Sequence, residues 1–283
     1  MPSPRSLFIG VDGTLRAGWK AALFLLVNGL IYNSVGVLLH KSGVLSVAAL
    51  GLQLWGFAAL SLLVTWLFLA LEGRPLTSIG LRLGRRWGLQ CLAGMAGGFM
   101  LMVSVAMIIR GLDGFHWERV AAGGLSSLGS GIWLLLAVAC REELLFRGYA
   151  FQRLVDGTGD WLALGLASLY FASAHWDNPG MTSPIQFWGL LNITLAGILL
   201  GLCYLKTRSL AMSIGLHLGW NWTQGSLLGF GVSGIRLGSF LEPVFHDRPL
   251  WLTGGSFGLE ASLPCAIICS LAILWMVRWK PGT

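Results

Sequence analysis

The chain of 283 residues is 55% hydrophobic and only 11% charged, with a mean hydropathy of +0.73, a composition that excludes an ordinary soluble protein. Its fourteen Trp and forty Gly fit a polytopic helical membrane protein, because Trp favours membrane interfaces and Gly is frequent in membrane helices. The net charge of +7 does not indicate nucleic acid binding, since the basic residues are spread along the connections between apolar segments.

Apolar segments along the chain predict an all-α protein with about eight transmembrane helices, folded as one integral membrane domain over residues 1–283. A hydrocarbon core of about 30 Å requires roughly 20 residues per span, and the fifth segment is shorter than this. In chain order the spans are expected at about 19–39, 44–71, 89–109, 131–155, 161–175, 187–205, 210–230 and 259–277.

The connections between these spans predict an orientation. Residues 76–90 carry Arg82, Arg85 and Arg86 among apolar residues, which is typical of a short basic helix on the cytoplasmic membrane surface. With both termini on that side, twelve Lys and Arg residues flank the inner ends of the spans and five flank the outer ends. The positive-inside rule therefore predicts that both termini are cytoplasmic.

Small residues inside the apolar segments predict packing. Gly94 and Gly98 stand at GxxxG spacing in the third segment, which indicates a face for close helix contact. The five cysteines all lie in apolar segments without metal-ligand spacing. We interpret them as small buried hydrophobic residues and expect no disulfide framework.

Four ionisable residues stand within seven positions at the end of the fourth apolar run, in the stretch Arg141-Glu142-Glu143-Leu144-Leu145-Phe146-Arg147. An ionised side chain at bilayer depth costs roughly 2.5 to 3.5 kcal/mol on insertion scales, so such a cluster indicates a functional site. Glu143 and Arg147 are four residues apart on one helical face, which favours an ion pair. Glu142 lies about 100° around the helix without such a partner and is left for proton transfer. Alternatively, the charges only lock a helix bundle or lie at the membrane interface.

Two later segments carry histidine at i, i+4 spacing, Phe171 with His175 and His217 with Asn221. At a rise of 1.5 Å per residue, Glu142, His175 and Asn221 lie roughly 16 to 23 Å from the inner boundary, so we expect one intramembrane polar cavity. Two imidazoles, a carboxylate and a carboxamide suit the attack of water on a carbonyl. We expect Glu142 with His175 to take the proton from water and return it to the leaving amine. His217 and Asn221 would hydrogen-bond the developing oxyanion.

A catalytic zinc ion is the competing chemistry. Glu142, His175 and His217 would supply three ligands and leave a fourth position for water. The sequence lacks HExxH, the strongest local signal of a zinc protease. The preferred prediction is a site without a cofactor, and Zn²⁺ stays open as the alternative.

The three motifs resemble those of the CAAX protease and bacteriocin-processing family, also called the Abi family, whose pattern is EExxxR, then FxxxH, then HxxxN or HxxxD on successive helices. Here they stand at 142–147, 171–175 and 217–221. A Gly-rich segment ending at Glu260 is similar to one before the last helix of bacterial members, which gives a catalytic region of about 130–260. The resemblance implies an intramembrane endopeptidase, related to the type II CAAX prenyl endopeptidase, in which Glu142 activates water while Glu143 and Arg147 orient the helix.

The resemblance also implies partners and a location. It indicates the lipid bilayer of a bacterial inner membrane and a membrane-associated peptide or protein substrate, but no particular cleavage sequence. A non-proteolytic binding or immunity scaffold of the same fold is the alternative from another class. A transporter with a proton relay is a third interpretation, although the sequence shows no inverted repeat or paired broken helices.

Overall fold

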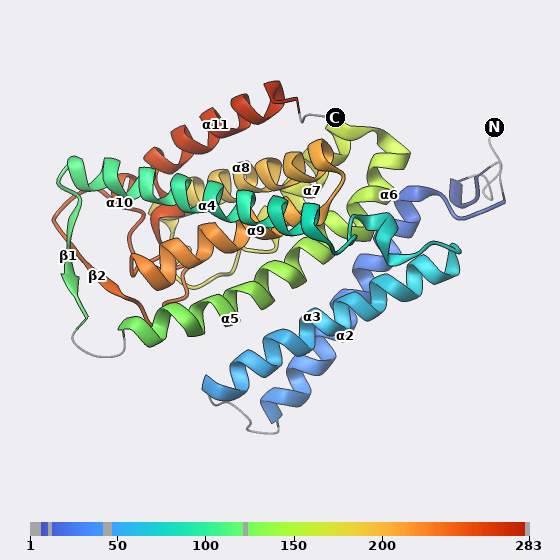
Figure 1. Cartoon of the computed structure of the whole chain (residues 1–283), viewed down its shortest axis with the longest axis horizontal. Helices are drawn as coiled ribbons and strands as arrows, with labels where there is room; N and C mark the ends of the chain where they lie inside the picture. The colour runs from blue at the N-terminus through green and yellow to red at the C-terminus, as the bar shows by residue number, and fades with distance from the viewer. Residues whose placement is uncertain (1–6, 11–12, 42–46, 121–123, 281–283) are drawn as a thin grey trace.

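The structure, a computed structural model, describes residues 7–10, 13–41, 47–120 and 124–280, and long apolar helices dominate it (Figure 1). Five helical segments of these residues are long and apolar enough to cross a membrane. This confirms the prediction of an all-α polytopic membrane protein. They are α2 (Ala17–Lys41), α3 (Val47–Leu71), α4 (Arg85–Gly111), the stretch from α5 (Gly124–Glu143) through α6 (Tyr149–Thr158), and α8 (Ser183–Thr207).

Three of the eight expected spans form shorter helices. They are α7 (Asp160–Ser173), α9 (Leu210–Trp222) and α11 (Leu263–Arg278), with 14, 13 and 16 residues. At 1.5 Å per residue α7 and α11 extend about 21 and 24 Å, less than the thickness of a hydrocarbon core. α9 is continued by a π-helical turn, Thr223–Leu227. The number of eight spans therefore stays a prediction. The beginning of the second expected span, at 44–46, lies outside the described residues.

The predicted surface helix at 76–90 is wrong. Only Leu76–Ile79 forms a single 3₁₀ turn, and α4 already begins at Arg85. Gly80 ends the turn with a left-handed backbone, φ = 86°, which interrupts any helix. A side chain here would also place its Cβ 2.7 Å from the Cα of Ser209, so close packing against the start of α9 requires a glycine.

A two-stranded antiparallel sheet joins two segments that the sequence presents as loops. β1 (Phe115–Arg119) pairs with β2 (Leu241–Phe245), with Phe115 opposite Phe245. Phe230 packs edge to face against both of these rings, at centroid distances of 4.9 and 5.8 Å. The strands are far apart in the chain, so no local pattern revealed the pairing. The segment after β2 contains α10 (Leu250–Thr253) and a 3₁₀ turn (Leu259–Ala261).

Helices α4 and α9 pack backbone to backbone (Figure 1). Gly94 and Gly98 of α4 lie against the backbone of α9, and a Cβ at either position would overlap it. Gly215 and Gly219 of α9 face α4 in the same way, with Gly215 against the Cys91 carbonyl. The predicted close-packing face of α4 is confirmed, and its partner is a second GxxxG on α9 that the sequence analysis did not single out. This contact fixes the depth and rotation of α9.

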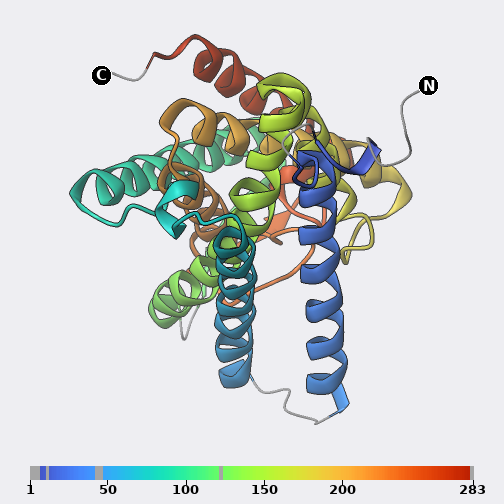
Figure 2. The same ribbon diagram turned by 90° about the vertical axis from the view of Figure 1, so that its right-hand side faces the viewer.

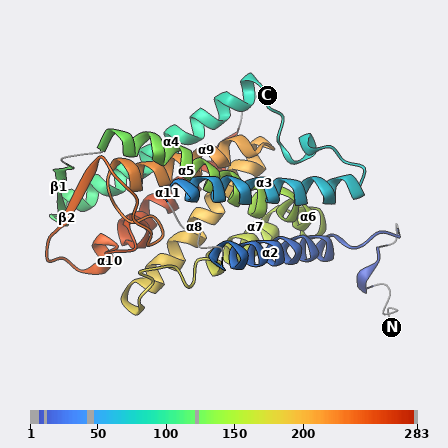
Figure 3. The same cartoon turned by 90° about the horizontal axis from the view of Figure 1, so that it is seen from below.

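The hairpin of α2 and α3 projects from the other helices at the end where the two are joined (Figure 2). Viewed from below, α3 runs beside α5 (Figure 3), and α2 contacts α6. At the opposite end of the hairpin, Glu72 connects it to α6. Its carboxylate lies 3.2 Å from Lys20 Nζ and 3.0 Å from Arg153 Nη1, and it accepts a 2.7 Å hydrogen bond from the Tyr149 hydroxyl.

These contacts keep Glu72 ionised. Burial alone opposes the charged form, but the hydrogen bond from Tyr149 and the cations Arg153 and Lys20 outweigh it, so the pKa of Glu72 lies below its usual range. The hairpin is thus anchored at this end by a charged cluster, and nearer its other end Trp55 of α3 packs against Trp133 of α5 at a centroid distance of 5.0 Å.

Candidate active site

The helix that carries the glutamates is interrupted where they lie. α5 ends at Glu143, the turn Leu144–Gly148 is π-helical, and α6 begins at Tyr149. The sequence predicts a continuous α-helix through this stretch, which is wrong at this turn. Such π-helical turns are rare, and they occur frequently at functional sites.

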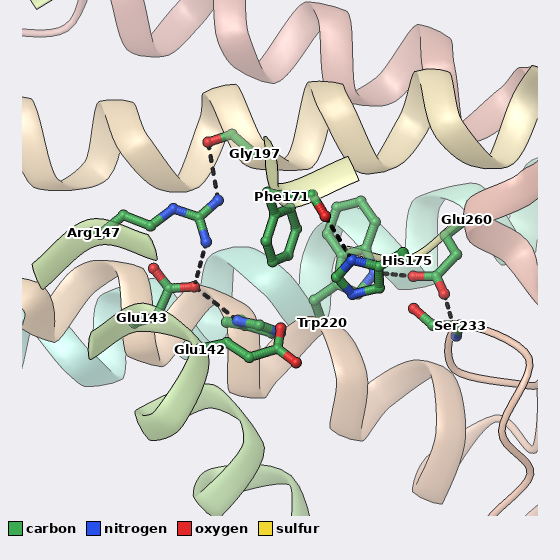
Figure 4. Close-up of polar contacts among 10 residues, drawn as sticks. Glu142, Glu143, Arg147, Phe171, His175, Gly197, Trp220, Ser233 and Glu260 are labelled. Atoms are coloured by element: carbon green, nitrogen blue, oxygen red, sulfur yellow. Dashed lines mark hydrogen bonds and ion pairs between the residues drawn. The ribbon is translucent and has the colours of Figure 1, made fainter. Parts of the chain in front are cut away.

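Glu143 connects two helices from a fully buried position (Figure 4). Its Oε1 accepts a 3.0 Å hydrogen bond from Arg147 Nη1 and a 2.8 Å hydrogen bond from His217 Nδ1. The predicted ion pair with Arg147 is therefore present. The bond to His217 was not foreseen, because it joins α5 to α9. The other carboxylate oxygen, Oε2, has no hydrogen-bond partner in the part of the chain that the structure describes.

Arg147 is 2% exposed, and its charge is compensated on three sides. Besides the bond to Glu143, its Nη2 donates to the Gly197 carbonyl of α8 at 3.2 Å. The guanidinium carbon lies 4.4 Å from the ring centroid of Phe171, a cation–π contact. Removing any one partner of such a buried cation leaves part of its charge uncompensated.

Glu142 and Glu143 have different surroundings despite being neighbours. The Glu142 side chain is 16% exposed, and its Oε2 lies 3.8 Å from Nε2 of His217. Because Nδ1 of that ring donates to Glu143, the neutral ring directs an unprotonated Nε2 toward Glu142. His217 is thus held between the two carboxylates, with Glu143 fixing its tautomer.

His175 lies just beyond the end of α7, in the turn after Ser173. Its Nδ1 donates to the Phe171 carbonyl at 2.8 Å, and the two rings meet edge to face at 4.7 Å. This arrangement gives the FxxxH spacing a physical meaning, since Phe171 orients the imidazole and also faces Arg147. Among the described residues, no hydrogen bond or ion pair joins His175 to Glu142.

One cavity of about 570 Å³ brings together Glu142, His175, His217 and Asn221, whereas Glu143 and Arg147 do not line it. The Asn221 side chain is buried, and its amide has no hydrogen-bond partner among the described residues. The walls come largely from apolar side chains of α2, α3, α5, the π-helical turn and α8, among them Leu25, Leu54, Val138, Leu145 and Ile193.

Glu260 is a buried carboxylate of this cavity that the sequence analysis gave no site role. One oxygen accepts a 3.3 Å hydrogen bond from Trp220 Nε1 and the other accepts one from the Ser233 amide. Figure 4 shows it on the side of His175 that faces away from Glu143. The signal that could have found it is an acidic residue directly after a Gly-rich segment and before an apolar helix.

The side chains do not form a ready metal site. Within the described ranges, no three His, Cys, Asp or Glu side chains come close enough together to hold an ion. Nδ1 of His217 is engaged by Glu143, and Nδ1 of His175 is engaged by a carbonyl. These bonds leave Nε2 of both imidazoles free, and the alternative zinc ligands Glu142, His175 and His217 all line the cavity, so the absence of a cofactor stays a prediction.

Comparison with known proteins gives one match. Residues 124–223 match the family described as Rce1-like, the type II CAAX prenyl endopeptidase Rce1-like family. The matched region runs from the start of α5 to the end of α9 and includes Glu142, Glu143, His175, His217 and Asn221. A search of curated proteins and a search of solved structures each found no match.

Proposed function

We propose that this chain, which belongs through residues 124–223 to the CAAX protease family, is an intramembrane endopeptidase in which Glu142 activates water. The observation that carries the proposal is the hydrogen-bonded series Arg147, Glu143 and His217, which ends 3.8 Å from the Glu142 carboxylate. A buried ion pair that orients an imidazole beside an accessible carboxylate is typical of a site for proton transfer.

The reaction proceeds by addition of water to the scissile carbonyl. As the water oxygen attacks the carbonyl carbon, Glu142 takes one of its protons. The Asn221 amide donates a hydrogen bond to the oxyanion that forms. When the C–N bond breaks, Glu142 together with His175 returns the proton to the leaving nitrogen, which yields a free amine and a carboxylic acid that keeps the second proton of the water.

The contact with Glu143 leads us to assign His217 a role beside Glu142, where the sequence suggested oxyanion binding. An imidazole whose Nδ1 donates to a carboxylate has a lone pair on Nε2 in its neutral form, and such an atom accepts hydrogen bonds. His217 therefore suits sharing the proton that Glu142 takes from water. Asn221 remains the donor for the oxyanion, because its amide lines the same cavity and has no hydrogen-bond partner among the described residues.

The cavity indicates the class of substrate. Apolar side chains of α2, α3 and α5 lead to Glu142, so an apolar segment or a lipid attached to the peptide is favoured over a hydrophilic chain. The prenyl endopeptidases named by the family match act on such lipid-modified peptides. We propose a membrane-associated peptide or protein as the substrate and no metal cofactor.

The test is hydrolysis of an internally quenched, prenylated CAAX peptide by the purified protein in lipid nanodiscs. Glu142→Gln should fold normally and lose at least about 10²-fold in turnover. Glu242→Gln, an exposed carboxylate of β2 paired with Arg236, is the matched control and should keep full activity. Normal turnover by Glu142→Gln would contradict the assigned base.

Two further outcomes of this experiment distinguish the alternatives. If the wild-type protein binds the peptide and releases no fragment, the protein is a non-proteolytic scaffold and the proposed endopeptidase activity is wrong. One zinc ion per chain in elemental analysis, removable only with loss of activity, would replace the metal-free mechanism with a metalloprotease.

We also propose that both termini face the cytoplasm of a bacterial inner membrane. The start of α2, the end of α11 and the connection from α3 to α4 lie at one end of the molecule, and the β1–β2 sheet lies at the other (Figure 1). In a cysteine-free background, Asp247→Cys near β2 should react with an impermeant thiol reagent on intact cells. Arg85→Cys should react only after permeabilisation, and the reverse pattern would invert the orientation.

A further inference from the structure

A second cavity lies at the end of the molecule where α4 and α9 begin, away from the catalytic residues. Its volume is about 560 Å³, and its walls come from the 3₁₀ turn before α4, the start of α4, α6 and the connection from α8 to α9. Five arginines line it together with a single carboxylate, Asp156. The arginines are Arg74, Arg82, Arg86, Arg153 and Arg208.

The carboxylates nearby compensate only two of these arginines. Arg153 pairs with Glu72 and with Asp156, each at 3.0 Å, and Arg208 lies 3.6 Å from Asp160. Arg74, Arg82 and Arg86 make no ion pair with a carboxylate in the part of the chain described here. The cavity therefore has a net positive charge that the protein itself leaves unbalanced.

Hydrogen-bond donors in the wall are unsatisfied as well. The Ser78 hydroxyl, the Trp87 indole N–H and Nε of Arg153 are buried and have no hydrogen-bond partner among the residues that the structure describes. Buried polar groups in folded proteins nearly always have partners, so these three donors indicate a missing acceptor. Oxygen atoms of a phosphate group meet both requirements, because they carry negative charge and accept several hydrogen bonds.

The surroundings favour a lipid as the source of this phosphate. Leu83, just before α4, is 78% exposed, and Leu89 and Leu92 on α4 are 56% and 63% exposed. This helix is long and apolar enough to span a membrane. An acyl chain that continues from a headgroup in the cavity has an apolar surface to follow along α4. A soluble phosphate compound has no acyl chain and would not contact these leucines.

We propose that this cavity binds the phosphate of an anionic phospholipid headgroup at the membrane surface. Basic pockets between transmembrane helices bind such headgroups by charge and hydrogen bonding together. Arg82 and Arg86 provide the uncompensated charge, and Ser78 and Trp87 provide neutral donors. The bound lipid connects α4, α6 and α9, and this role does not depend on the peptidase reaction.

The experiment compares lipid binding by variants of the full chain. Purified protein in a neutral detergent receives dioleoylphosphatidylglycerol, dioleoylphosphatidylcholine or inorganic phosphate, and bound lipid is followed by native mass spectrometry and thermal melting. The test variant is the double change Arg82→Ala with Arg86→Ala. The control is Arg85→Ala with Arg278→Ala, which removes the same charge from exposed positions that do not line the cavity.

We expect phosphatidylglycerol to bind the wild type and the control equally and to raise both melting temperatures. Binding to Arg82→Ala with Arg86→Ala should be weaker by about 30-fold, since each arginine near a charged membrane surface contributes on the order of 1 kcal/mol. Equal binding to the two double variants would refute the site. If inorganic phosphate stabilised the wild type as much as phosphatidylglycerol does, the cavity would be an anion site without a lipid. If phosphatidylcholine bound as tightly as phosphatidylglycerol, the negative charge of the lipid would not contribute to binding. Each of these results would contradict the proposal.

Discussion

Two clusters in this protein have nearly the same chemistry and opposite surroundings. Behind the cavity wall, Glu143 accepts hydrogen bonds from Arg147 and His217, and all three side chains are at most 8% exposed. Near the β1–β2 sheet, Asp113 is bound in the same way by Arg248 at 2.7 Å and by His246 at 2.8 Å. There, however, the Asp113 side chain is 63% exposed.

The second ring nitrogen of each histidine faces another titratable group. Nε2 of His217 faces Glu142 at 3.8 Å, and Nε2 of His246 lies 2.8 Å from Nδ1 of His116. Water around the exposed cluster screens its charges and solvates the charged group that remains when its partner is removed. In the buried cluster, every lost partner leaves an uncompensated charge. The comparison teaches that burial, rather than residue type, makes such a group suited to catalysis.

The largest effect is expected for Glu143→Gln. The change leaves the Arg147 guanidinium buried without its counter-ion, and breaking a buried pair in this way destabilises a protein by about 3–5 kcal/mol. It also removes the carboxylate that orients His217. Unfolding in mixed micelles should show the loss of stability. The control is the double change Glu143→Leu with Arg147→Met, which removes both charges and should recover much of the stability.

Asn221→Ala should have the next largest effect, on rate and not on folding. If its amide is the oxyanion donor, kcat falls by about 10² to 10³ and KM changes little. Asn28→Ala is the matched control, since this amide lines the same cavity but already donates to the Phe24 carbonyl. A larger change in KM than in kcat for Asn221→Ala would assign the residue to substrate binding.

The smallest effect is expected in the exposed cluster. Asp113→Asn should lower the melting temperature only slightly, and added salt should remove the shift. A loss of stability comparable to that of Glu143→Gln would break the distinction between the two clusters.

The pH dependence of this small effect has a definite sign. Hydrogen bonds from Arg248 and His246 hold the pKa of Asp113 below its usual range. The Asp113 carboxylate therefore contributes its full stabilisation at any pH above the pKa of Asp in the unfolded chain, about 3.9. This stabilisation is lost as the pH falls through the lower pKa of Asp113 in the folded protein. The difference between the wild type and Asp113→Asn should vanish in acid, which melts across that range would measure.

Much of the fold follows from local patterns. The long apolar runs, which no soluble chain tolerates, predicted the helices, because a bilayer requires every backbone amide to be bonded within its own segment. The GxxxG spacing of Gly94 and Gly98 is also a local pattern, and it predicted a close helix contact because small residues allow two backbones to approach each other. Local patterns could not predict the pairing of β1 with β2 or the break at Gly80, because both depend on distant segments.

The sequence by itself predicted one cavity for Glu142, His175, His217 and Asn221, and only the tertiary structure added Glu260 and decided what each side chain contacts. Helical spacing was sufficient to pair Glu143 with Arg147, since both lie within two turns of one segment. The bond from His217 to Glu143 arises because the glycines of α9 bring it against α4 and place it beside α5. Hydrogen bonds between helices depend on their relative depth and rotation, which packing sets and no single segment encodes.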